Sequence, residues 1–321
     1  MRAIDNPGDG RQHGTVRTAS VTCLVLALSW LAGCTVGPQP SHPRPALVHE
    51  ATPVQAPELL ELAHHERGRS TGILLGDGEE VRFEVRRAGY NRDAIGTRPL
   101  VLLVPILAGG RELMGMIAGR LVDHDFDVAF CERAGRALTP PQRGADLDEL
   151  FRRTVLHQRL LLKWLRGSDK PPPSVHVLGL SMGGIISTVL TAVDPEVRSV
   201  AICLAGADLA SLVLESSEDR VHKWLEWRQK TDGIGVDSLH WELSQYLDYE
   251  PSNFAPFVPT EKVLFVSAMW DTVVPRRNQS LLWEGLGRPE RLDMPFGHYS
   301  AAIAVDRVIG AAAAHFRAHC P

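Results

Sequence analysis

The sequence lacks the features that define several classes of protein. Its five cysteines are too few and too scattered for a disulfide scaffold, and no two of them have the spacing of zinc ligands. No block of like charges occurs among its 34 basic and 38 acidic residues, so the chain has no electrostatic footprint for nucleic acid. It contains no internal repeat and no glycine pattern of a dinucleotide or P-loop site. We therefore expect no nucleic-acid partner, no metal and no cofactor.

The composition fits a globular domain of enzyme size. Hydrophobic residues make up 44% and charged residues 22% of the 321 positions, close to the averages of ordinary globular proteins. Such a composition excludes a disordered, collagen-like or polytopic membrane protein. It says nothing of the reaction, which has to be inferred from motifs.

The N-terminal segment has the pattern of a secretion signal. Basic residues precede an apolar run from Val21 to Ala32, which as a helix would extend about 18 Å, well short of a ~30 Å hydrocarbon core. The run ends in Leu31-Ala32-Gly33-Cys34, which resembles the lipobox of bacterial lipoproteins. The resemblance implies that residues 1–33 form a lipoprotein signal peptide and that Cys34 is acylated, a palmitate-type modification. A plain signal peptide is the alternative.

Residues 34–58 are expected to tether this anchor to the folded domain. Six prolines lie between Pro38 and Pro57 with little apolar periodicity, which favours an extended, semi-rigid spacer. Thr35 follows the cysteine at the position where lipoproteins retained in the inner membrane have Asp. The resemblance therefore implies a bacterial outer-membrane location facing the periplasm, with the bilayer as a partner through Cys34.

Residues 59–321 alternate between strand-like and helix-like patterns. Short apolar runs typical of buried strands are separated by segments with helical periodicity, which predicts an α/β fold with a mainly parallel sheet. The expected strands are Glu80–Arg87, Leu100–Leu107, Phe126–Cys131, Val175–Leu180, Val197–Leu204 and Val263–Ala268. The expected helices are Glu112–Val122, Leu147–Leu165, Met182–Ala192 and Ala301–His315.

One long interval interrupts this alternation. Roughly 55 residues separate the strands that end near Leu204 and begin near Val263, far more than an ordinary connection needs. We expect an inserted helical cap at about residues 207–258, whose tryptophans, tyrosines and phenylalanines form an apolar wall of a binding site. The alternative is a peripheral helix pair whose aromatic residues pack only on themselves.

Gly179-Leu180-Ser181-Met182-Gly183 fits the G-x-S-x-G pattern of a nucleophile elbow. The motif directly follows a predicted strand and directly precedes a predicted helix, which is the setting that the motif requires. Small flanking residues let strand and helix approach closely, and the serine hydroxyl then projects beside the helix N-terminus. Ser181 is therefore the candidate nucleophile, and it needs a base because a serine hydroxyl is weakly nucleophilic at neutral pH.

An acid and a histidine follow the serine in the order that such a site requires. Asp271 comes three residues after a buried-type strand, and His298 precedes the last predicted helix. Asp208, which follows the preceding strand, is the alternative acid. Asp293 lies close to His298 in sequence and is expected to be a solvated loop charge.

These residues together resemble the α/β-hydrolase superfamily from about Gly72 to His315. The resemblance implies an eight-stranded, mostly parallel sheet with helices on both faces. It also implies a catalytic Ser181, Asp271 and His298. For the oxyanion hole it implies the Met182 N–H and a second donor from the loop after the third strand, where Leu107 is expected and Ile106 is the alternative.

The predicted function is hydrolysis of a carboxylic ester through an acyl-enzyme, with a small-molecule or acyl ester as substrate and no cofactor. Amide or peptide hydrolysis on the same fold is a second hypothesis, because a fold does not choose the leaving group. A non-catalytic binding protein of the cell envelope is a third. The sequence makes no prediction of the oligomeric state.

Overall fold

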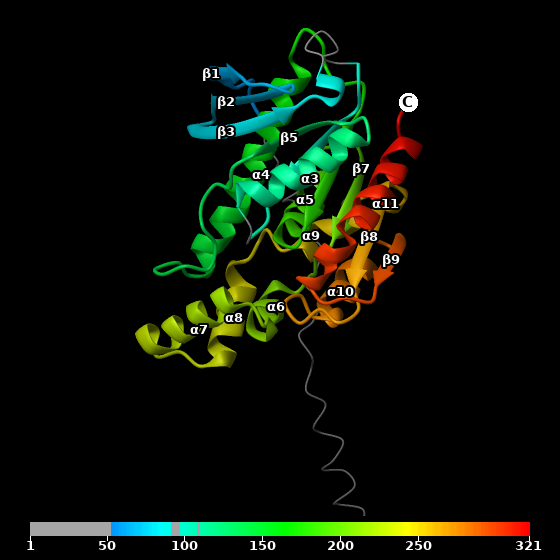
Figure 1. Cartoon of the computed structure of the whole chain (residues 1–321). Helices are drawn as coiled ribbons and strands as arrows, with labels where there is room; N and C mark the ends of the chain where they lie inside the picture. Colours follow the sequence, from blue (N-terminus) through cyan, green and yellow to red (C-terminus); the bar gives the residue numbers. More distant parts are fainter. Residues whose placement is uncertain (1–52, 91–96, 108–109) are drawn as a thin grey trace, which may run out of the picture. The chain divides into compact units, whose positions relative to one another are not determined.

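One sheet organises the part of the chain that the structure describes. The computed structural model describes residues 53–90, 97–107 and 110–321. Across these ranges nine strands form a sheet of order β1-β2-β3-β5-β4-β6-β7-β8-β9 (Figure 1). The predicted signal peptide, the acylation site Cys34 and most of the tether lie outside them. No helix within them is both long and apolar enough to cross a bilayer.

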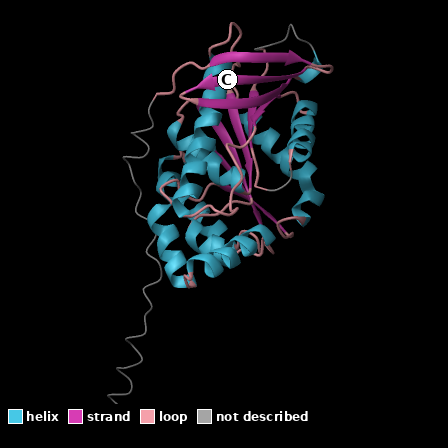
Figure 2. Cartoon of the chain, turned by 90° about the vertical axis from the view of Figure 1, so that its left-hand side faces the viewer, coloured by secondary structure: helices cyan, strands magenta, loops and turns pink. Residues whose placement is uncertain are grey.

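The predicted α/β fold with a mostly parallel sheet is confirmed. Six neighbouring strands run parallel from β5 to β9, and most of them are buried because helices cover both faces (Figure 2). They are β4 (Leu100–Val104), β5 (Asp127–Cys131), β6 (Val175–Leu180), β7 (Val197–Cys203), β8 (Val263–Ala268) and β9 (Glu290–Met294).

The described sheet has one strand more than the eight expected. β1 (Glu58–His64), β2 (Arg69–Gly76) and β3 (Glu79–Arg86) form an antiparallel extension, and β3 pairs with β5. All seven residues of β1 are exposed. Its sequence, Glu-Leu-Leu-Glu-Leu-Ala-His, has neither a long apolar run nor a strict alternation, so it does not reveal a strand. Its pairing to β2 also shifts between Leu59 and Glu61, which breaks the period further.

Alternate residues of the central strands enter two separate cores. In β4, for example, Leu102 packs into the core on one face and Leu103 into the core on the other. Helices α3 (Arg111–Asp123) and α11 (Val305–Ala318) cover one face. Helices α4 (Gly144–Arg166), α5 (Met182–Val193) and α10 (Arg276–Gly285) cover the other. Short 3₁₀ helices lie at Ala88–Tyr90 and Ser300–Ala304.

The long interval between β7 and β8 is helical, as predicted. It contains α6 (Leu209–Glu215), α7 (Asp219–Asp232), α8 (Val236–Tyr246), α9 (Pro251–Phe254) and 3₁₀ turns at Ala255–Phe257 and Thr260–Lys262. We call residues 207–258 the cap insertion. Trp224 joins it to the rest of the fold: its side chain is fully buried, and its Nε1–H donates to the Gln142 carbonyl before α4 at 2.9 Å.

We expect Trp224→Ala to lower the free energy of unfolding by about 3–5 kcal/mol, because it removes a fully buried aromatic ring and leaves a cavity. Trp224→Phe keeps most of the buried ring and should cost about 1–2 kcal/mol, mainly the lost hydrogen bond. Urea unfolding followed by circular dichroism measures both. A loss below 1 kcal/mol for the alanine variant would show that the cap insertion is not held by this residue.

Candidate active site

Ser181 occupies a strained turn between a strand and a helix. β6 ends at Leu180 and α5 begins at Met182, and between them Ser181 has φ 55° and ψ −124°. A positive φ is rare for a residue with a side chain, and such strain persists only where the surroundings enforce it. One such contact is the Ser181 N–H, which donates to the Cys203 carbonyl at the end of β7 at 2.8 Å.

Glycines around Ser181 leave no space for a side chain. A Cβ built on Gly179 would lie 2.2 Å from both the Gly183 carbonyl oxygen and Ser187 Oγ. A Cβ on Gly183 would lie 2.6 Å from the Val104 carbonyl oxygen at the end of β4. The glycines of the motif therefore serve close packing between β6, α5 and the neighbouring strand.

Three side chains that are distant in sequence meet at this turn. His298 Nε2 lies 3.0 Å from Ser181 Oγ, and His298 Nδ1 lies 2.7 Å from Asp271 Oδ2. The other oxygen of Asp271, Oδ1, accepts the N–H groups of Val273 and Val274 at 2.9 and 2.8 Å. Because an ionised carboxylate only accepts, Nδ1 carries the proton and the lone pair of Nε2 faces the serine hydroxyl.

The structure does not bring the alternative acids to the imidazole. Asp208 caps the N-terminus of α6 and pairs with Arg277 at 3.2 Å. Asp293 lies on β9, rather than in a loop as expected, and pairs with Arg291 at 2.9 Å. Asp271 is thus the carboxylate that contacts His298.

The sequence-predicted oxyanion donors lie near the serine. Met182 is the first residue of α5, so its N–H has no acceptor within the helix. Leu107 and Ile106 both line a cavity with Ser181. The loop backbone that follows β4 therefore flanks Ser181, and which of the N–H groups of Ile106 and Leu107 would bind an oxyanion stays a prediction.

Arg133 contacts this loop, and no sequence pattern had pointed to it. Its Nη1 donates to the Leu107 carbonyl. Burial lowers the pKa of Arg133, and the positive charges of Arg220 and Arg136 lower it further, yet a guanidinium stays protonated at neutral pH. The contact holds the Leu107 carbonyl in the loop that carries the expected second donor.

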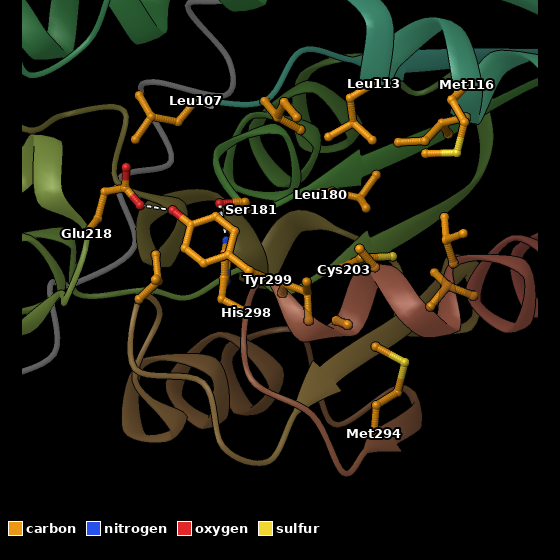
Figure 3. A pocket seen from close by; sticks show the side chains of 18 residues that line it. Leu107, Leu113, Met116, Leu180, Ser181, Cys203, Glu218, Met294, His298 and Tyr299 are labelled. Carbon is orange, nitrogen blue, oxygen red and sulfur yellow. Dashed lines mark hydrogen bonds between the residues drawn. The ribbon is translucent and has the colours of Figure 1, made fainter. Parts of the chain in front are cut away.

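Two apolar cavities meet at Ser181. The larger, of about 150 Å³, lies between α3 and the segment from Ser300 into α11 (Figure 3). The smaller, of about 60 Å³, lies between α4, α5 and the cap insertion. Ser181 lines both cavities, as do Leu107, Glu218 and Val273. Ser181 therefore stands between two apolar compartments.

The predicted aromatic wall is wrong for these two cavities. The cap insertion lines them with aliphatic residues (Leu209, Leu212, Val213 and Val221), together with Ser216 and Glu218. Its aromatic rings lie elsewhere, because Trp224 and Phe254 are buried in the core while Trp241 and Tyr246 are exposed on α8.

Buried thiols accompany the site without an evident chemical role. Cys131 and Cys203, each at the end of a core strand, are buried. Cys203 lines the larger cavity, and burial raises the pKa of its thiol to about 12, so it is neutral there. Within the described ranges, no group of three or more His, Cys, Asp and Glu side chains could hold a metal ion.

Solved structures resemble the fold, with little identity in sequence. Acetyl xylan esterase 1 from Thermoanaerobacterium sp. JW/SL YS485 aligns with a TM-score of 0.57 at 16% identity, covering 83% of this chain and 91% of its own. The α/β hydrolase GrgF from Penicillium sp. sh18 has a TM-score of 0.55 at 14% identity, covering 78% and 99%. The Pyrococcus furiosus esterase Pf2001 has a TM-score of 0.54 at 11% identity, covering 81% and 93%.

No protein-family model and no curated protein matches the sequence. At such low identity the structural likeness establishes the fold alone: the chain has the α/β-hydrolase fold.

The packing around Gly179 makes a testable prediction. Gly179→Ala should lower the free energy of unfolding by about 3 kcal/mol or abolish soluble expression, because the new Cβ would overlap backbone. Gly310→Ala in α11 is the matched control: apart from the nearby backbone of its own helix, no atom lies within 4 Å of its added Cβ, and alanine favours a helix interior by about 0.5–1 kcal/mol. Thermal unfolding compares the two variants, and equal stability would refute the steric account.

Proposed function

We propose that this chain is a serine hydrolase that cleaves carboxylic esters through an acyl-enzyme intermediate. The observation that carries the proposal is the continuous hydrogen-bonded path from Ser181 through His298 to Asp271. The Ser181 end of this path lies between two apolar cavities, where a hydrophobic substrate can reach the serine oxygen. Such a path lets a base remove the hydroxyl proton as the oxygen attacks a carbonyl.

The first half of the reaction forms the acyl-enzyme. Ser181 Oγ attacks the ester carbonyl while His298 Nε2 takes its proton, and Asp271 stabilises the imidazolium through Nδ1–H. The Met182 N–H and an N–H of Leu107 or Ile106 bind the oxyanion, beside the positive end of the α5 dipole. His298 then gives the proton to the departing alkoxide.

The second half releases the acid. A water molecule enters beside His298, which removes a proton from it as the oxygen attacks the acyl carbonyl. The oxyanion forms and collapses again, and Ser181 recovers its proton from His298. No step calls for a cofactor.

Two features favour a small ester over other substrates. The larger cavity, of about 150 Å³, is comparable to one that holds a benzene-sized apolar group. Two of the structural neighbours are named as esterases, one of them an acetyl xylan esterase. We infer an ester with a short apolar acyl or alkyl group on one side of the carbonyl.

The identity of the acid is tested by a pair of variants. We expect Asp271→Asn to lower kcat about 10⁴-fold, because the amide fixes the wrong imidazole tautomer. Asp208→Asn is the matched control and should change kcat by less than about threefold, since Asp208 caps a helix and does not contact His298. Hydrolysis of p-nitrophenyl butyrate measures kcat for both variants. A large loss of kcat in Asp208→Asn together with little change in Asp271→Asn would assign the acid to Asp208.

We further propose that the enzyme is anchored to the outer membrane through an acyl group on Cys34, as the lipobox-like sequence suggests. Radiolabelled palmitate should be incorporated into the full-length protein expressed in a Gram-negative bacterium, and Cys34→Ala should abolish the label and release the protein from membranes. Cys320→Ala serves as control and should keep the label. Label that persists in Cys34→Ala would remove the anchor proposal.

A further inference from the structure

Glu218 lines both cavities, and Tyr299 lines the larger one. The Tyr299 hydroxyl donates to Glu218 Oε2, and the ring of Tyr299 stands edge-on to His298 with 5.4 Å between centroids. Figure 3 shows the Tyr299 ring beside Ser181 and His298, with its hydroxyl directed at the Glu218 carboxylate. Neither residue belongs to the hydrogen-bonded path of the proposed reaction.

The backbone before Glu218 is fixed to the loop that carries the proposed acid. The Ser217 N–H donates to the Thr272 carbonyl at 2.9 Å, and the two hydroxyls of these residues lie 2.7 Å apart. The Glu218 N–H donates to Ser216 Oγ at 3.3 Å, and Glu218 is the N-cap of α7. Because Thr272 follows Asp271 directly, the backbone that carries Glu218 is held next to the proposed acid.

This carboxylate contrasts with its surroundings. Glu218 is the only Asp or Glu among the described residues that line the two cavities, and most of the others are aliphatic. A carboxylate has two oxygens and accepts about four hydrogen bonds. Tyr299 donates to Oε2, whereas no donor from the described residues contacts Oε1. The contact lies at the exposed mouth of the site, where 61% of the Tyr299 surface is accessible. An ionised carboxylate there forms a stronger hydrogen bond with a donor of a bound molecule than a neutral acceptor would.

We propose that Glu218 accepts a hydrogen bond from a hydroxyl or ammonium group on the alcohol part of the substrate, which makes esters of polyols or amino alcohols the preferred class. The proposal rests on the ester hydrolase function above. We assign the alcohol part to Glu218 because the leaving oxygen must face His298, and Tyr299, whose hydroxyl contacts Glu218, packs edge-on against the His298 ring.

The same carboxylate disfavours an anionic leaving group through like-charge repulsion. Arg220, two residues further along α7, lines neither cavity, and Arg133 already donates to the Leu107 carbonyl. Neutral or cationic alcohols with a donor are therefore favoured over carboxylate-bearing ones.

Five butyrate esters with one acyl chain test the proposal. The 2-(dimethylammonio)ethyl ester is paired with its apolar isostere, the 3-methylbutyl ester. The 2-hydroxyethyl ester is paired with the propyl ester, and the 2-carboxyethyl ester is the anionic member. Acid release in a pH-stat at pH 7 gives kcat/KM for each. We expect at least one donor-bearing ester to exceed its isostere about tenfold, and the pair that does so identifies ammonium or hydroxyl.

Variants assign that preference to the carboxylate. Glu218→Leu should bring the ratio within the preferred pair to about one, because the donor of the substrate then has no acceptor at this position. Glu226→Leu, on the exposed face of the same helix, should keep the ratio. Tyr299→Phe should also keep it, because the carboxylate remains. Thermal unfolding checks that each variant is folded.

Several results would overturn the proposal. Ratios near one in the wild type, a preference that survives Glu218→Leu, or fastest turnover of the anionic ester would each do so. Equal acceleration of all five esters by Glu218→Leu and Tyr299→Phe would show that the pair gates the cavity instead of recognising a donor. Turnover of none of the esters by the wild type would refute the proposed function itself, and this proposal with it.

Discussion

The backbone conformation of Ser181 is the constraint on which the rest of the site depends. A positive φ at a residue with a side chain costs about 1–3 kcal/mol, and here the residue lies between a buried strand and a buried helix whose packing holds the turn in place. The same turn directs the N-terminus of α5 toward the serine. It also requires glycine at positions 179 and 183, because any Cβ there would overlap neighbouring backbone.

The parallel sheet supplies the other two groups. β6, β8 and β9 run in the same direction, so the segments that follow them leave the sheet at one edge. Ser181 follows β6, Asp271 follows β8 and His298 follows β9. Side chains 90 and 117 residues from the serine therefore reach hydrogen-bond distance of one another without any local sequence relation.

Features with a local pattern could be predicted from sequence, and features that depend on packing between distant segments could not. The strand–turn–helix setting around Ser181 and the helical character of the cap insertion follow from short-range periodicity and spacing. The fully exposed strand β1 has no such pattern. Tertiary packing creates the aliphatic cavity walls, the contact of Arg133 with the Leu107 carbonyl and the Glu218–Tyr299 contact. The aromatic residues of the cap insertion therefore led to a wrong prediction of which side chains line the cavities.

The most direct test of the account is to locate the covalent adduct of a fluorophosphonate on the intact protein. Mass spectrometry of the labelled and digested wild type should find one phosphonyl group, on the Oγ of Ser181, and Ser181→Ala should carry none. An adduct on a different residue, or unchanged labelling of the alanine variant, would contradict the central claim that Ser181 is the nucleophile.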